Sequence, residues 1–239
     1  MKTFKDKVVL VTGANRGIGK SLVKAVLEKG AQKVYATARD IGTMPDFGDT
    51  RVVPITLDIT NVAQVTKVAE EAMDTQILIN NAGVLHPGSV FEGTIDDMRS
   101  DMDTNYFGTI YMMRAFAPVL EKNAPANIIN IASIAARSPL PFIAGYAASK
   151  AALRSATLTA RTELTKKGVV VQIVNPGPID TDINKGAPWD MPSPDDTARI
   201  ILDEVETGKR EIFPDKIGQE MYALWQEDPD KFYKQNLGE

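Results

Sequence analysis

The stretch Val8-Val9-Leu10-Val11-Thr12-Gly13-Ala14-Asn15-Arg16-Gly17-Ile18-Gly19 lies near the start of the chain and predicts its fold. The apolar run at 8–11 is typical of a strand that is buried on both faces. A helical pattern from Lys20 to Lys29 follows the glycines, and Gly30 ends it. A strand, a glycine-rich turn and a helix in this order indicate a phosphate site, because a helix N-terminus offers free N–H groups and partial positive charge.

Further apolar runs alternate with helical patterns along the rest of the chain. The predicted strands are Lys33–Ala38, Arg51–Leu57, Ile77–Ile79, Asn127–Ala132, Val169–Val174 and the short Glu211–Phe213. The main predicted helices are Val62–Met73, Thr94–Lys122, a helix that carries Tyr146 and ends at Gly168, and Asp195–Thr207. This alternation predicts an α/β fold: a doubly wound parallel sheet of about seven strands with helices on both faces. We expect one domain over residues 1–239.

Composition and charge narrow the classes of function. A net charge of −4 gives no electrostatic case for binding nucleic acid or an anionic membrane. Cys is absent, which excludes disulfides and thiolate metal ligands, and we predict no metal site. The N-terminal residues run directly into the first strand without an apolar signal segment, and no apolar run approaches the ~20 residues of a membrane helix. The expected location is the cytoplasm.

Two arginines lie where a dinucleotide fold would hold the adenosine ribose. Arg39 closes the second predicted strand, and the position about 20 residues past the glycines meets this ribose. An acid there would bond a free 2′-hydroxyl, but Ala38 and Arg39 occupy it. Arg16, inside the glycine turn, would approach the same point, and two guanidiniums suit a 2′-phosphate. We therefore expect NADP(H), although Asp40 could instead pair with one of the arginines.

Other residues at the carboxyl ends of the strands are expected to contact the rest of the cofactor. Asp58 either accepts from an adenine amino group or caps the following helix. Small and amide residues after the fourth strand fit a backbone that lies against a cofactor. The Ile179 N–H and the Thr181 hydroxyl can hold a carboxamide. The full expected cofactor set is Gly13, Asn15, Arg16, Gly17, Ile18, Gly19, Arg39, Asp58, Ile59, Asn81, Ala82, Gly83, Tyr146, Lys150, Pro176, Gly177, Ile179 and Thr181.

Tyr146 and Lys150 lie four residues apart in the helix after the fifth predicted strand. Residues at i and i+4 share one helix face, so the phenol and the ammonium can reach one point. A phenol titrates near ~10, and a cation within about 4–6 Å lowers the pKa of an acid by roughly 1–3 units. One lysine is nearly enough to activate Tyr146 near pH 7, and the positive ring of a cofactor could supply the rest. Ser133, at the carboxyl end of the fifth strand, points toward the same crevice as Gly13, Asp58 and Asn81, because ligands sit beyond the carboxyl ends of strands in open α/β sheets.

The ordered set of motifs resembles the short-chain dehydrogenase/reductase family, in its single-domain branch. The resemblance covers nearly everything from Lys7 to about Thr181. It rests on Thr12-Gly13-x3-Gly17-Ile18-Gly19, Asn81-Ala82-Gly83, Asn105, Ser133, Tyr146-x3-Lys150 and Pro176-Gly177. It implies a Rossmann-type fold and hydride transfer between a nicotinamide and a carbonyl or alcohol carbon.

The resemblance also implies a role for each of four residues. Tyr146 is the general acid for carbonyl reduction or the base for alcohol oxidation. Lys150 lowers the pKa of Tyr146 and holds the nicotinamide ribose. Ser133 bonds the substrate oxygen, and Asn105 holds a water that links Lys150 to solvent.

The sequence constrains the identity of the substrate less than it constrains the type of reaction. Residues 182–194 are rich in Gly, Pro and Asp and predict a mobile substrate loop, and a helical tail starts at Lys216. Tyr222 and Trp225 in this tail are expected to pack somewhere, on this chain or on a partner subunit. His86, the only histidine, is expected in a surface loop. The side chains expected to line an apolar substrate pocket are Leu85, Leu140, Phe142, Ile183 and Trp189.

These features favour a carbonyl reductase or alcohol dehydrogenase for a small or medium apolar ketone, aldehyde or alcohol. A 3-oxoacyl-carrier-protein reductase is the first alternative, and a non-catalytic NADPH-sensing protein is the second. A carrier-protein reductase would need a basic patch, for which Lys185, Lys209 and Arg210 are a thin supply. The resemblance favours a homodimer or a homotetramer.

Overall fold

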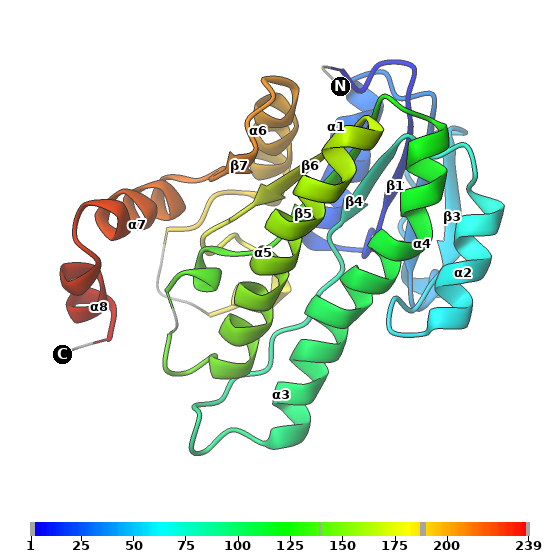
Figure 1. Cartoon of the computed structure of the whole chain (residues 1–239). Helices are drawn as coiled ribbons and strands as arrows, with labels where there is room; N and C mark the ends of the chain where they lie inside the picture. Colours follow the sequence, from blue (N-terminus) through cyan, green and yellow to red (C-terminus); the bar gives the residue numbers. More distant parts are fainter. Residues whose placement is uncertain (1–2, 139, 187–189, 238–239) are drawn as a thin grey trace.

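The computed structural model describes residues 3–138, 140–186 and 190–237 and contains one parallel sheet (Figure 1). The sheet has seven strands in the order β3-β2-β1-β4-β5-β6-β7, and every adjacent pair is parallel. The strands are β1 Val8–Val11, β2 Lys33–Ala38, β3 Val52–Thr56, β4 Ile77–Asn80, β5 Ala126–Ile131, β6 Val169–Val174 and β7 Glu211–Ile212. The predicted Rossmann-type α/β fold is confirmed.

Helices cover both faces of this sheet. The described helices are α1 Gly17–Glu28, α2 Val62–Glu71, α3 Ile95–Asp101, α4 Thr109–Lys122, α5 Ala144–Leu164, α6 Pro194–Glu206, α7 Lys216–Glu227 and α8 Pro229–Leu237. Of these, α7 and α8 lie beyond the β7 edge of the sheet and not on a face (Figure 1). Strand β1 divides the core by alternation: Val9 and Val11 pack in the cluster of α1 and α6, whereas Val8 and Leu10 pack in that of α2 and α4. No helix in the described ranges is both long and apolar enough to span a membrane.

The strand order places a ligand crevice at β1 and β4. The chain moves outward from β1 to β2 and β3, then returns to the other side of β1 with β4. Connections therefore leave the carboxyl ends of β1 and β4 in opposite directions, and such a switch point opens a crevice in doubly wound sheets. The glycine turn follows β1 and Asn81 follows β4, so the topology brings them together.

One long predicted helix is interrupted in the structure. The sequence predicts a continuous helix over Thr94–Lys122, but α3 and α4 are joined by a π-helical segment, Met102–Gly108. Asn105 lies in this segment and is fully buried. π-Helical turns are rare and are frequent at functional sites. The contacts of Asn105, described below, join this segment to other elements.

The C-terminal tail packs on its own chain through α7, at the β7 edge of the sheet (Figure 1). The Tyr222 ring stacks on Phe213 with centroids 4.1 Å apart. The Arg137 guanidinium lies 4.7 Å from the Tyr222 centroid and 4.6 Å from that of Trp225. The aromatic residues that we expected to pack thus hold α7 to the turn that follows Ser133.

Candidate active site

A cleft of about 1280 Å³ opens at the carboxyl ends of the strands. The eighteen residues expected to contact the cofactor all line it, together with Ser133. They come from elements as distant in sequence as the glycine turn and the segment after β6. The fold therefore gathers them on one surface, as expected at the switch point of a parallel sheet.

The glycine turn is packed too tightly for side chains. Gly13 adopts φ +64°, a conformation that favours glycine, and a Cβ there would lie 2.8 Å from the Ala82 Cα. A Cβ at Gly19 would lie 2.0 Å from the Gly13 carbonyl oxygen. The turn therefore presents bare backbone to the cleft, the surface that a pyrophosphate requires.

The N-terminus of α1 supports the same ligand. Its first turn holds no acidic side chain, and Arg16 at the N-cap makes no side-chain cap. In contrast, side chains of Asn61, Ser193 and Asp215 cap α2, α6 and α7. Unsatisfied N–H groups with partial positive charge, next to bare glycine backbone, fit a bound pyrophosphate.

Thr12 and Asn81 fasten the glycine turn to the end of β4. The Thr12 Oγ1 accepts from the N–H groups of Asn81 and Ala82, at 2.9 and 3.0 Å. The Asn81 Nδ2 donates to the carbonyl oxygens of Thr12 and Gly13, at 2.9 and 3.1 Å. Sequence reasoning gave Thr12 no role of its own, although it belongs to the quoted motif. Asn81 lines the cleft, and Thr12 holds the backbone of Asn81 and Ala82 in place. Both residues therefore shape the surface that a cofactor would contact.

The two arginines expected at the 2′-phosphate differ in their surroundings. No acidic side chain in the described part of the chain is ion-paired with Arg39. Asp40, considered as a partner for an arginine, instead accepts from the Gly42 N–H at 2.9 Å and closes the short turn after β2. Arg16 donates from Nη1 to Asp182 Oδ2 at 3.0 Å.

Asp58 does not cap the helix that follows it. Its Oδ1 accepts from the Thr60 N–H and hydroxyl, at 2.9 and 2.8 Å. The cap of α2 is Asn61, which accepts from the Gln64 N–H at 3.1 Å. Asp58 lines the cleft, and its expected contact with an adenine amino group stays a prediction.

Tyr146, Lys150 and Ser133 meet at the wall of the cleft. The first two lie one turn apart in α5, and the Lys150 Nζ is 5.6 Å from the centroid of the Tyr146 ring. Lys150 is only 4% exposed and donates to the Ile131 carbonyl at 3.0 Å. An ammonium has three donors, so the single protein acceptor that Lys150 has within the described part of the chain leaves capacity for ribose hydroxyls.

Burial dominates the titration of this pair. It raises the pKa of Tyr146 to about 12, an effect that hydrogen bonding with Ser133 opposes and the charge of Asp101 reinforces. Burial also lowers the pKa of Lys150 to about 8, against the opposing effect of Asp101. Burial is the largest effect on this phenol, and the expected lowering of the Tyr146 pKa by Lys150 stays a prediction.

Asn105 lies behind the cleft rather than in its wall. Its Oδ1 accepts from the Val84 N–H at 2.9 Å, and its Nδ2 donates to the Val84 carbonyl and the Ser149 hydroxyl, both at 2.9 Å. The side chain therefore joins the segment after β4 to α5, beside Lys150. Its expected role in holding a water stays a prediction.

His86 and Asp101 form a pair that the sequence did not reveal. The His86 Nδ1 lies 2.9 Å from the Asp101 Oδ1, and Asp101 is 1% exposed. Burial raises the pKa of this carboxyl, and His86 opposes that effect. His86 lies in a loop, as expected, but its side chain is half-buried and paired with Asp101. No motif links these positions, so only the fold could find them.

The residues expected to line an apolar substrate pocket lie in different places. Ile183 lines the cleft. Leu85 and Leu140 instead pack with Tyr146 on a small apolar cluster beside it, and they are not part of its described lining. Phe142 is half exposed, and Trp189 lies outside the described residues. Sequence reasoning missed other lining residues, namely Val84, Phe107, Tyr111 and Asn184.

Comparison with known proteins identifies the class of protein that this fold and site define. Residues 7–191 match the model of the short chain dehydrogenase family. The chain belongs to this family of oxidoreductases, which use a nicotinamide cofactor and act on CH–OH or C=O groups.

Particular relatives extend the match over most of the chain. An uncharacterized oxidoreductase of Staphylococcus saprophyticus is 32% identical over 79% of this chain and 85% of its own. A short chain dehydrogenase from Burkholderia cenocepacia, solved with NADP, is 39% identical and covers 98% of this chain and 99% of its own, with a TM-score of 0.94. A Burkholderia phymatum relative, solved with NAD, is 25% identical over 96% of each chain, with a TM-score of 0.85.

Proposed function

We propose that the protein is an NADP(H)-dependent carbonyl reductase or alcohol dehydrogenase for small or medium apolar substrates. The observation that carries the proposal is the arrangement of Ser133, Tyr146 and Lys150 in the lining of the cleft that the glycine turn also lines. This arrangement brings an acid, a hydrogen-bonding hydroxyl and a cation to the place where a nicotinamide would lie.

The preference for NADP(H) is supported by charge. Arg39 lines the cleft at the end of β2 with no acidic partner in the described chain, so its guanidinium is available to a 2′-phosphate. The Burkholderia cenocepacia relative was solved with NADP and the Burkholderia phymatum relative with NAD. The higher identity of the former agrees with the charge argument.

In carbonyl reduction, different residues of the chain bind the cofactor, orient the substrate and transfer the proton. When bound, the nicotinamide supplies the hydride. The glycine turn and the N-terminus of α1 hold the pyrophosphate, and Lys150 holds the ribose hydroxyls. Ser133 donates to the substrate oxygen and orients the carbonyl beside Tyr146. Tyr146 then transfers its phenolic proton to that oxygen as negative charge develops on it.

The titration of Tyr146 suits the reducing direction. With a pKa raised to about 12, the phenol is protonated at neutral pH and is ready to act as an acid. Oxidation of an alcohol needs the phenolate, which requires positive charge beyond that of Lys150. The oxidised nicotinamide carries such a charge, so the base form depends on the bound cofactor.

The test is a panel of ketones, aldehydes and alcohols assayed with NADPH and NADP⁺, for the wild type and Tyr146→Phe. The substitution removes only the hydroxyl, so kcat should fall by about 10²–10⁴ while NADP⁺ binding is retained. Full activity of this variant would contradict the assignment. Tight NADPH binding without turnover of any compound would instead favour a sensing protein.

An acyl-thioester arm of the same panel addresses the carrier-protein alternative. Turnover of a 3-oxoacyl thioester at higher kcat/KM than any free ketone would favour that reading. We also propose a homodimer or homotetramer, which light scattering tests against the 26.0 kDa mass of one chain.

A further inference from the structure

Arg16 forms an ion pair with Asp182 in the lining of the cleft. Its Nη1 lies 3.0 Å from the Asp182 Oδ2, and both residues line the cleft. The segments that carry them are in direct contact, since a Cβ on Gly17 would lie 3.2 Å from the Thr181 Cγ2. The pair therefore joins the glycine turn to the segment after β6, in the lining of the cleft that an anionic cofactor would contact.

A stronger anion can replace Asp182 as the partner of Arg16. The side chains of Arg16 and Asp182 are 62% and 66% exposed, and exposed ion pairs contribute little to stability. A phosphate carries more charge than a carboxylate and offers three acceptor oxygens, to which a guanidinium binds bidentately. Arg16 can therefore pair either with the Asp182 carboxylate or with a phosphate, whereas Arg39 has no acidic partner among the described residues.

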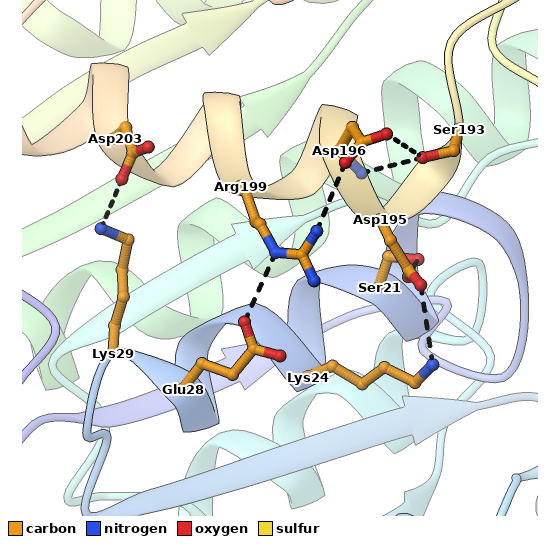
Figure 2. Close-up of polar contacts among 9 residues, drawn as sticks. All are labelled: Ser21, Lys24, Glu28, Lys29, Ser193, Asp195, Asp196, Arg199 and Asp203. Atoms are coloured by element: carbon orange, nitrogen blue, oxygen red, sulfur yellow. Dashed lines mark hydrogen bonds and ion pairs between the residues drawn. The ribbon is translucent and has the colours of Figure 1, made fainter.

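The helix behind Arg16 is held independently of this pair. Figure 2 shows polar contacts between α1 and α6, among them Ser21 Oγ to Asp195 Oδ1 at 2.5 Å and Lys29 Nζ to Asp203 Oδ1 at 2.7 Å. Lys29 also reaches Glu206 Oε2 at 2.7 Å. Loss of the Asp182 contact would thus change the partner of the Arg16 side chain without releasing α1.

We propose that Asp182 is a specificity-determining residue, whose carboxylate competes with the 2′-phosphate of NADP(H) for Arg16. The competition lowers the affinity for the phosphorylated cofactor below the value that Arg16 and Arg39 together would give. NAD(H) lacks the 2′-phosphate, so its affinity depends little on this contact. The proposal rests on the proposed cofactor preference and deepens it.

The experiment measures binding of NADP⁺, NAD⁺ and 2′,5′-ADP by titration calorimetry to the full-length protein. Asp182→Asn keeps the shape of the side chain and removes its charge. We expect Kd for NADP⁺ and 2′,5′-ADP to fall about 3–5-fold and Kd for NAD⁺ to change less than about 2-fold, a range that matches replacement of an exposed pair. In the Arg16→Ala background, the same substitution should bring no gain for any of the three.

Asp203→Asn is the matched control. Asp203 is 68% exposed and pairs with Lys29, the C-cap of the helix whose N-cap is Arg16, but it is not among the described residues that line the cleft. The variant changes net charge by the same amount, and Lys29 keeps Glu206. It should leave all three dissociation constants unchanged, which separates local competition from a general gain in positive charge.

Several outcomes would overturn the proposal. Equal tightening of NADP⁺ and NAD⁺, or a gain that persists in the Arg16→Ala background, would show an effect other than competition at the 2′-phosphate. Weaker NADP⁺ binding by Asp182→Asn would show that Asp182 orients Arg16 instead of competing for it. A wild type that binds neither dinucleotide would overturn the proposed function itself. Measurable NADP⁺ binding that Asp182→Asn leaves unaltered would overturn this inference alone.

Discussion

Lys150 is a buried side chain, and desolvation disfavours its charged form. Burial lowers its pKa from 10.5 to about 8, which corresponds to a cost of about 3 kcal/mol in the folded state at neutral pH. The unfolded chain binds the proton more tightly than the folded protein between these two values, so this contribution makes stability rise with pH from about 8 to 10.5. The site keeps a destabilising cation because the proposed chemistry uses it.

Lys150→Met should therefore stabilise the fold at neutral pH. The variant removes the buried charge but leaves the Ile131 carbonyl without its donor, so we expect a net gain of about 1–2 kcal/mol at pH 7. By pH 10.5, where the wild-type side chain is neutral as well, the gain should be lost and the variant should be less stable by about 1–2 kcal/mol, because the Ile131 carbonyl still lacks its donor. Denaturant unfolding of both proteins across this pH range checks the prediction, and a gain independent of pH would contradict it.

Backbone atoms around Gly19 leave no room for a side chain at this position. A Cβ there would lie 2.0 Å from the Gly13 carbonyl oxygen, so Gly19→Ala should cost about 3 kcal/mol or more. Gly48→Ala is the comparison, because Gly48 has positive φ and nothing within 4 Å of the added Cβ. That variant should cost only about 1–2 kcal/mol, from conformational strain alone. Similar losses in both variants would show that the close packing of the glycine turn is not what selects glycine.

At the scale of elements, α7 holds a turn of the candidate site. Asp215 caps this helix by accepting from the Gly218 N–H at 2.7 Å, and its other oxygen accepts from the Gly177 N–H at 2.7 Å. Gly177 follows β6 and lines the cleft, where we expect the nicotinamide. A helix near the end of the chain therefore supports the turn at the end of β6.

Asp215→Asn tests this support. An amide leaves one of the two N–H groups without an acceptor, so the variant should lose about 1–3 kcal/mol of stability and its KM for NADPH should rise. Ser193→Ala is the control, since it removes the cap of α6 at a cost of about 1 kcal/mol without touching Gly177. An equal rise in KM for both variants would indicate general loosening instead of a displaced turn.

The element boundaries show where sequence patterns stop being sufficient. The 94–122 region has a helical pattern throughout, and the pattern contains nothing that distinguishes a π-helical segment. Asn105 is hydrogen-bonded to Val84 and Ser149, which lie in other elements. Contacts of this kind set the local register, and helix propensity cannot report them.

At the scale of the molecule, ligand binding and stability are linked. A ligand that binds only the folded state stabilises it by about 2.7 kcal/mol at a concentration 100 times Kd. For a chain of this size, each kcal/mol shifts Tm by about 2–4 °C, so saturating NADP⁺ should raise Tm by about 5–10 °C. NAD⁺ at the same concentration should raise it less. Thermal scans with each cofactor check the prediction, and a larger shift with NAD⁺ would contradict the NADP(H) proposal.

The sequence by itself determined the parallel α/β fold and the elements from which the site is built. Buried strands, glycine turns and helix periods are local patterns, and their order along the chain restricts the topology to a few solutions. For that reason, Gly13, Ser133, Tyr146 and Lys150 could be assigned to one crevice before the structure was known. Short-range regularity was enough for this step.

Only the tertiary structure decided the partners and the charges of those residues. The pairs Arg16–Asp182 and His86–Asp101 join residues from different elements, and no spacing rule connects them. The pKa values of Tyr146 and Lys150 depend on how deeply α5 is buried, which no count of residues between motifs can supply. The physical reason is that desolvation and Coulomb energy depend on distances in space, which the chain fixes only when it has folded.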